Sequence, residues 1–153
     1  MAMLRSFLLL FVIFSMGNAA VRPSCPFGWT NFGYRCYKHI SQMADWIRAE
    51  RNCQSLGANL ASVRNKLENN FLLSLLPSSA TRCWVGAHEG VQGGEWMWTD
   101  GAAFLYTNWC PGEPNNSQQP ETCLELNFPN GRCWNDAPCS ISKSYFCAKK
   151  AFG

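Results

Sequence analysis

Oxygen-bearing side chains gather in three short stretches of the second half of the chain. In order, these stretches are Glu113-Pro114-Asn115, Glu121 and Trp134-Asn135-Asp136. Their carboxylates and carboxamides suit a hard cation such as Ca²⁺, which takes about six to eight oxygen ligands in a flexible geometry. If the five polar side chains converge on one ion, coordination positions remain for the oxygens of a second ligand. The pattern therefore predicts a calcium-centred binding site.

Turn chemistry explains part of the same pattern, because proline, glycine and asparagine are frequent in turns. For Asn135-Asp136 alone an ordinary surface loop is the better interpretation, whereas the complete set of five favours calcium. Asn115 also begins Asn115-Asn116-Ser117, an acceptor sequence for N-glycosylation. A glycan there would remove a calcium ligand, so Asn115 is either a ligand or a glycan carrier.

Little else in the chain suggests catalysis. His39 and His88 are the only histidines, they lie far apart in the sequence, and neither belongs to a nucleophile–base pattern. The prominent acids are already assigned to a metal. We therefore do not expect an enzyme.

The N-terminus has the composition of a secretory signal. Arg5 supplies a positive charge, residues 7–14 are all apolar, and Gly17-Asn18-Ala19 offers small residues for cleavage. The apolar run is far shorter than the ~20 residues of a membrane-spanning helix. We expect a signal peptide over residues 1–19, one domain over residues 20–153, and a secreted protein without membrane insertion.

Composition narrows the class of protein further. Nine cysteines in a secreted chain of 153 residues predict a disulfide framework. A zinc site is not expected, because the sequence contains no Cys-x-x-Cys pair. The net charge of +3 is spread over scattered basic residues, so charge gives no reason to expect a nucleic-acid partner.

Two helices are predicted in the first half of the chain. The first, over residues 41–56, follows from four residues at helical spacing, namely Trp46, Ala49, Cys53 and Leu56. Gly57 would end it. Asn65 with Glu68 resembles a capping box at the start of the second helix, which Pro77 would end.

The later part of the chain reads as short strands separated by turn residues. Strands are expected within residues 25–39 and over residues 83–86, 95–98, 123–126 and 144–147. Loops are expected over residues 86–94 and 107–120. Helices followed by strands describe an α+β domain, and long loops in a compact domain are usually functional.

In this order the residues resemble the C-type lectin-like domain family. The matching series is Cys53, Trp84-Val85-Gly86, Trp98-Thr99-Asp100-Gly101, Glu113-Pro114-Asn115, Cys123, Trp134-Asn135-Asp136, Cys139 and Cys147. The resemblance covers essentially the whole mature chain, which looks like the small soluble lectins and type II antifreeze proteins of fishes. It implies two helices, small antiparallel sheets and a long calcium-binding loop.

The resemblance also implies how the cysteines pair. The implied disulfides are Cys25–Cys36, Cys53–Cys147, Cys123–Cys139 and, as in the antifreeze branch, Cys110–Cys133. Cys83 then has no partner. It is either a buried thiol or an exposed one that links a disulfide-bonded homodimer. The dimer is slightly favoured, because Thr81 and Arg82 beside it are expected to be exposed.

By the same resemblance, one Ca²⁺ and a sugar share five residues: Glu113, Asn115, Glu121, Asn135 and Asp136. Two vicinal sugar hydroxyls would complete the coordination. In the family the Glu-Pro bond is cis, which turns both neighbouring side chains to one side, and Glu-Pro-Asn accompanies mannose-type sugars. We therefore expect a secreted, calcium-dependent, mannose-binding lectin, serving for example in innate defence. The alternative is ice binding by a type II antifreeze protein, with a venom-type protein antagonist as a third interpretation.

Overall fold

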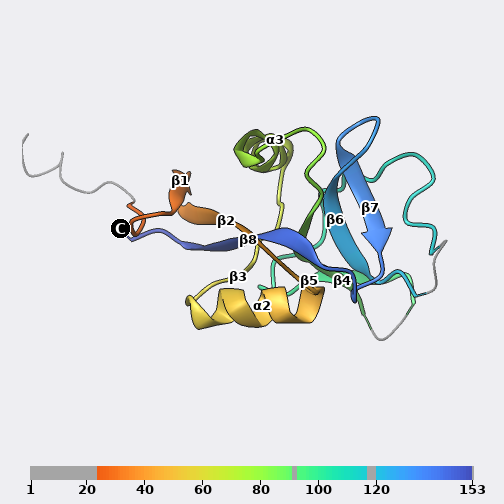
Figure 1. Ribbon diagram of the computed structural model, residues 1–153, viewed down its shortest axis with the longest axis horizontal. Helices are drawn as coiled ribbons and strands as arrows, with labels where there is room; N and C mark the ends of the chain where they lie inside the picture. The colour runs from red at the N-terminus through yellow and green to blue at the C-terminus, as the bar shows by residue number, and fades with distance from the viewer. Residues whose placement is uncertain (1–23, 91–92, 117–119, 153) are drawn as a thin grey trace, which may run out of the picture.

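The computed structural model describes residues 24–90, 93–116 and 120–152. The predicted signal peptide lies outside these ranges. The elements in chain order are β1 (Thr30–Phe32), β2 (Arg35–Ala44), α2 (Trp46–Ser55), β3 (Asn59–Leu60), α3 (Lys66–Leu75), β4 (Cys83–Glu89), β5 (Trp96–Trp98), β6 (Cys123–Phe128), β7 (Cys133–Ala137) and β8 (Lys143–Lys150) (Figure 1). None of the described helices is long and apolar enough to cross a membrane.

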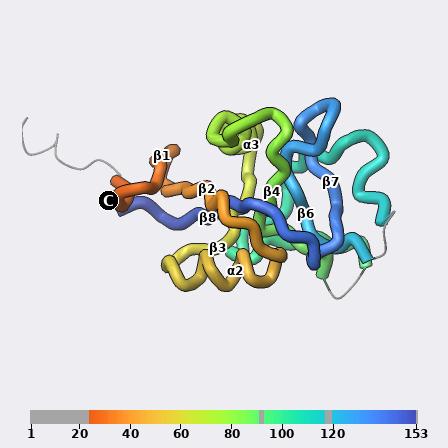
Figure 2. Tube along the Cα trace, in the orientation of Figure 1, coloured from red at the N-terminus to blue at the C-terminus, as the bar shows by residue number. Residues whose placement is uncertain are grey.

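The strands form one sheet in the order β1-β2-β8-β4-β6-β7, with β3 added to β8 and β5 added to β4. All neighbours pair antiparallel except β4 and β8, which are parallel. The helices α2 and α3 lie on opposite sides of the β2–β8 pair (Figure 1). Residues 111–116 loop out beyond β6 and β7, at the end of the molecule opposite the C-terminus (Figure 2).

The first helix begins later than the sequence pattern predicts. Up to Ala44 the chain continues β2, where Ala44 pairs with Lys143 of β8. Asp45 then caps α2, because its carboxylate accepts a hydrogen bond from the Arg48 amide at 2.9 Å. The prediction of helix over residues 41–44 is wrong because the partner strand lies about a hundred residues away, beyond any local pattern.

The start of the second helix is as predicted. The side chain of Asn65 accepts a hydrogen bond from the Glu68 amide at 2.8 Å. Glu68 reaches back to accept from the Arg64 amide at 2.8 Å, one residue before the cap. This reciprocal satisfaction of helix-start amides is the physical content of a capping box.

The strand that starts at Cys83 extends to Glu89, so the expected loop over residues 86–94 is wrong for residues 86–89. Ala87, His88 and Glu89 pair with β5. Gly86 is packed so closely that a Cβ there would lie 2.5 Å from the carbonyl oxygen of Leu60. This glycine therefore lets β3 approach β4 and does not mark a loop.

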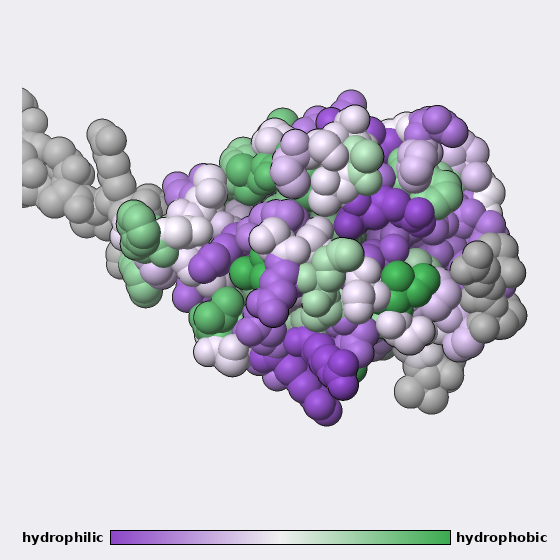
Figure 3. All heavy atoms as spheres, viewed as in Figure 1, coloured by the Kyte–Doolittle hydropathy of each residue, from purple (hydrophilic) through white to green (hydrophobic). Residues whose placement is uncertain are grey.

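Large aromatic rings make up much of the core. Trp84 and Trp134 are fully buried. The indole of Trp134 donates a hydrogen bond to Asn69 Oδ1 at 2.9 Å, and four aromatic residues surround it: Trp98, Phe104, Tyr106 and Trp109. On the face shown in Figure 3 the apolar residues form separate small patches, and strongly hydrophilic ones gather over α2.

Four disulfides brace the fold, and they are the pairs that the resemblance implies: Cys25–Cys36, Cys53–Cys147, Cys110–Cys133 and Cys123–Cys139. Cys83 is a free thiol with no exposed surface. Burial raises the pKa of this thiol far above its usual range. The expectation of an exposed Cys83 that links two copies is therefore wrong, and the buried thiol is the correct alternative, because a disulfide needs an accessible thiolate.

Candidate functional site

The five predicted ligands line one cavity of about 480 Å³. Glu113 and Asn115 belong to the long loop, Glu121 lies two residues before the start of β6, and Asn135 and Asp136 lie in β7. Arg82 and Lys143 belong to the same wall. Residues that span 24 positions of the sequence are thus brought to one place at the end of the sheet.

Backbone and disulfide contacts fix the base of the loop to β7. The Cys110 amide donates to the Trp134 carbonyl at 2.9 Å, and the Trp134 amide donates to the Asn108 carbonyl at 2.8 Å. The Cys110–Cys133 disulfide joins the same two segments. Because Asn135 follows Trp134, these contacts set the position of the loop ligands relative to the strand ligands.

The loop closes onto Asp136 through its backbone. The Asp136 carboxylate is fully buried and accepts from the Asn115 amide at 3.1 Å and from the Asn116 amide at 2.8 Å. The Glu113–Pro114 peptide bond is cis. The Asn115 side-chain amide donates to Glu113 Oε1, so these two side chains lie together as the sequence predicts.

Glu113 stands in a strongly acidic setting. The pKa of Glu113 is raised to about 7, first by burial and then by the adjacent carboxylate of Asp136 and the charge of Glu121. The hydrogen bond from Asn115 acts in the opposite direction and lowers this pKa. Among the described residues, Glu113 Oε2 is buried without a hydrogen-bond partner. A bound cation would satisfy this oxygen and offset the mutual repulsion of the carboxylates.

The donor set fits Ca²⁺ only when the amides take part. In the described part of the chain, no three His, Cys, Asp or Glu side chains are gathered closely enough to hold a metal on their own. The amide oxygens of Asn115 and Asn135 would therefore have to join the carboxylates. A mixture of carboxylate and amide oxygens at one cavity is typical of calcium rather than of zinc or copper.

Sequence reasoning missed the residue that orients Asn135. Glu125 of β6 is fully buried and pairs directly with Asn135 in the β6–β7 ladder. Its carboxylate accepts a hydrogen bond from Asn135 Nδ2 at 2.8 Å. Because the amide nitrogen is held from this side, the amide oxygen of Asn135 is available to the cavity.

Two cations neutralise Glu125. Lys143 Nζ lies 2.7 Å from one carboxylate oxygen, and the Arg82 guanidinium bonds to both oxygens. A carboxylate with no exposure is tolerated only when it is paired in this way. The available signal was an acidic residue between Leu124 and Leu126 in an apolar strand, a pattern that indicates a buried charge in need of partners.

Comparison with known proteins establishes the family. The family model described as the lectin C-type domain matches residues 42–149. The chain therefore belongs to the C-type lectin family, whose domain is a binding module and not an enzyme.

Individual relatives agree with this assignment. The galactose-specific lectin nattectin of Thalassophryne nattereri is 41% identical over 129 residues, covering 82% of this chain and 80% of the relative. A calcium-independent type II antifreeze protein superposes with a TM-score of 0.80 at 33% identity, covering 87% of this chain and 99% of that one. The cow CD23 carbohydrate-recognition domain, solved in the presence of GlcNAc2Man3, gives a TM-score of 0.80 at 30% identity, covering 86% and 100%.

Proposed function

We propose that the protein is a secreted lectin that binds carbohydrate through Ca²⁺ held by Glu113, Asn115, Glu121, Asn135 and Asp136. The observation that carries the proposal is that all five side chains line one cavity. The unpartnered, buried Glu113 Oε2 adds a local reason to expect a cation. With three carboxylates facing the ion, the affinity for Ca²⁺ would be modest, in the range of ~10⁻⁴–10⁻³ M found for extracellular modules.

The sugar would add oxygens that the protein does not supply. Calcium provides electrostatic attraction for two vicinal hydroxyls. Glu113 accepts hydrogen bonds from a hydroxyl, and the Asn115 amide donates to one, so the pair reads hydroxyl orientation. The chain carries Glu and Asn on either side of Pro114, the combination that the family uses for mannose. We propose mannose-type specificity on this ground.

Galactose is the sugar to test against mannose. The similar protein nattectin is named galactose-specific, while the similar cow CD23 domain was solved with a mannose-containing oligosaccharide. Both sugars offer vicinal hydroxyls, in different orientations. The competition experiment below therefore uses both.

The test is retention on mannose-agarose with calcium, elution with EDTA, and competition by free mannose or galactose. Glu113→Gln should abolish retention, because it removes a charged ligand. Glu95→Gln is the matched control, since Glu95 is exposed and does not line the cavity. Retention that persists in EDTA, or equal loss in both variants, contradicts the proposal.

Ice binding is the second candidate function. The observation in its favour is the TM-score of 0.80 with a calcium-independent type II antifreeze protein. An ice-binding protein would show thermal hysteresis and no retention on either sugar resin. Thermal hysteresis that survives EDTA would favour this second function over the first.

Secretion and the processing site belong to the same proposal. The relatives named above include a fish lectin, and the sequence of residues 1–19 fits a signal peptide. Intact-mass measurement of the protein from culture medium tests both this cleavage and the state of Asn115. A mass increment of an N-glycan on Asn115 would contradict the ligand assignment.

A further inference from the structure

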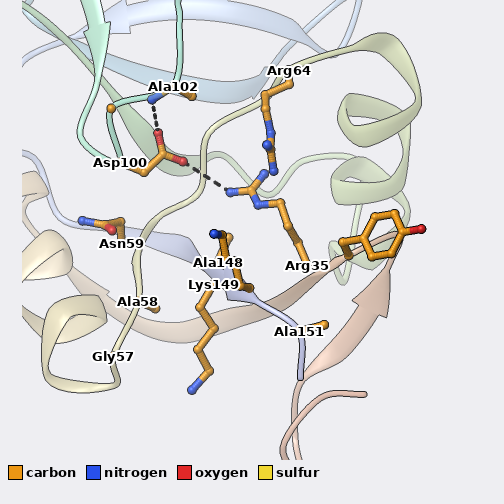
Figure 4. Close-up of a pocket in the computed structure, with 13 residues that line it drawn as sticks. Arg35, Gly57, Ala58, Asn59, Arg64, Asp100, Ala102, Ala148, Lys149 and Ala151 are labelled. Carbon is orange, nitrogen blue, oxygen red and sulfur yellow. Dashed lines mark hydrogen bonds and ion pairs between the residues drawn. The ribbon is translucent and has the colours of Figure 1, made fainter. Parts of the chain in front are cut away.

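A second, larger cavity of about 710 Å³ is shown in Figure 4. In Figure 1 the start of β2 and the end of β8, which contribute to its lining, lie toward the C-terminal end of the molecule, away from β6 and β7. The lining of this cavity comes from the β1–β2 turn, the entry to β3, the turn after β5 and the end of β8. The hollow exists because many lining residues are small: Gly57, Ala58, Gly101, Ala102, Ala148 and Ala151. A ligand could therefore approach the backbone closely.

Positive charge dominates this cavity. Arg35, Arg64, Lys149 and Lys150 line it, and Asp100 is the acidic residue among the described lining residues. Figure 4 shows Arg35 and Arg64 converging from two segments, while Lys149 extends from β8 away from them. The cations thus stand on different sides of one hollow.

Arg35 is the fixed part of the cavity. It is buried, donates to Tyr37 Oη at 3.0 Å and to Ser62 Oγ at 3.1 Å, and pairs with Glu68 and Asp100 at 3.5 Å each. The Asp100 carboxylate is itself committed, because it also accepts from Ser62 Oγ and from the Ala102 amide. The negative charge of Asp100 is therefore already compensated by groups of the protein.

The remaining cations are available to a ligand. Arg64 shares Glu68 with Arg35 through a 3.5 Å contact, and its side chain is 46% exposed. Lys149 Nζ donates to the Leu56 carbonyl at 3.0 Å, which leaves further donors on the ammonium. Lys150 is exposed. The carboxylates of Glu68 and Asp100 balance the charges of the two arginines. Lys149 and Lys150 therefore give the cavity its net positive charge.

The rim adds an apolar face. Tyr34 lines the cavity and is 81% exposed. A smaller hollow of about 330 Å³ shares Tyr34, Arg35 and Arg64 with the first. Cationic donors beside an exposed aromatic ring match a sugar that carries anionic groups, because the ring can pack on the sugar and the cations can bind the oxyanions.

We propose that this cavity is a calcium-independent site for an anionic polysaccharide. The anionic group can be a sulfate ester or a carboxylate, since guanidinium and ammonium groups bind both. The site does not depend on the proposed calcium-dependent lectin function, because it shares no residue with the cavity of Glu113 and Asp136. If both sites are occupied, one molecule of the protein can link two glycans.

The test uses the full chain in EDTA, which switches off any calcium site. Biosensor surfaces carrying dextran sulfate, carboxymethyl-dextran and unmodified dextran are compared at about 50 mM salt, where screening is moderate. Binding to the charged dextrans and not to plain dextran is expected, and the stronger of the two signals identifies the preferred anion. No binding to either charged dextran overturns the proposal.

Variants separate a defined site from diffuse charge. Lys150→Glu should weaken binding about tenfold, and Arg64→Gln should weaken it severalfold. Arg48→Glu is the control with the same charge change as Lys150→Glu, because Arg48 is exposed on α2 and does not line the cavity. Equal weakening in the control overturns the proposal. Thermal unfolding midpoints equal to that of the unsubstituted protein would show that the variants fold.

Discussion

Replacing Glu125 by glutamine removes one negative charge from the interior and keeps nearly the same shape. In the native protein this carboxylate, with no exposed surface, compensates Lys143 and Arg82. The Lys143 side chain is only 10% exposed, whereas Arg82 is 37% exposed. After the substitution Arg82 can turn toward water, but Lys143 keeps a buried charge whose remaining described contact is the Trp84 ring at 5.2 Å.

The magnitude follows from the buried partner. Breaking a buried ion pair by removing one member costs about 3–5 kcal/mol. Because one of the two cations can be rehydrated, we expect the lower end, about 3 kcal/mol in the free energy of unfolding. For a domain of this size that corresponds to roughly 10 °C in the unfolding midpoint.

The assay is guanidinium unfolding with the disulfides intact, in EDTA, so that no metal contributes. Glu95→Gln serves as the control, because that carboxylate is exposed and should change stability by less than about 0.5 kcal/mol. The double variant Glu125→Gln, Lys143→Met should recover most of the loss, since no unpaired ammonium remains. Calcium affinity should fall about tenfold in Glu125→Gln, because glutamine keeps a single acceptor oxygen, for which Asn135 must compete with Arg82.

The reasoning is refuted if Glu125→Gln is as stable as the Glu95→Gln control. It is also refuted if the double variant is less stable than Glu125→Gln. In the first case the buried carboxylate does not compensate the two cations. In the second, Lys143 is not the source of the cost.

Three further predictions concern the same site and Cys83. The pKa of Glu113 is raised from its ordinary 4.5 to about 7, so without calcium its ionisation opposes folding. Stability in EDTA should therefore fall as the pH rises from 4.5 to 7, and calcium affinity should rise as the pH rises through 7. Glu113→Gln should flatten both pH profiles. Glu113→Gln with Asn115→Asp should shift elution from mannose toward galactose; continued elution by mannose alone contradicts the reading of hydroxyl geometry by this pair. Cys83 should resist thiol reagents until unfolding, and non-reducing gels should show a monomer.

The parts of the fold that sequence could anticipate are those fixed by local chemistry. Asn65 and Glu68 cap α3 as expected, and strands lie over residues 96–98 and 123–126 as predicted. These features depend on a few neighbouring residues or on motifs that recur in order through the family. The four disulfides came from the resemblance, because many connectivities fit the cysteine count.

The features that sequence reasoning missed depend on distant partners. Ala44 is strand because Lys143 of β8 pairs with it, and Gly86 is strand because its amide and carbonyl bond to the distant backbone of Ala61 and Thr99. Cys83 is buried although polar residues precede it, since it sits in the parallel β4–β8 pairing opposite Ser144. Glu125 can be recognised as the partner of Asn135 only from the pairing of β6 with β7, which places the two residues opposite each other.

The same limit applies to the candidate site. The order of residues in the sequence could identify five candidate ligands, namely Glu113, Asn115, Glu121, Asn135 and Asp136. It could not give the distances between their side chains. The structure adds that the backbone of the loop already contacts Asp136. Their roles as ligands of calcium and sugar remain our prediction.

The central claim is that calcium at this cavity creates the sugar site. The most direct test is calorimetric titration of methyl α-mannoside into the protein, first with calcium and then after EDTA, with methyl galactoside in parallel. The account predicts saturable heat with calcium, stronger for the mannoside, and none after EDTA. Absence of binding to either sugar with calcium present, or identical binding in EDTA, would contradict it.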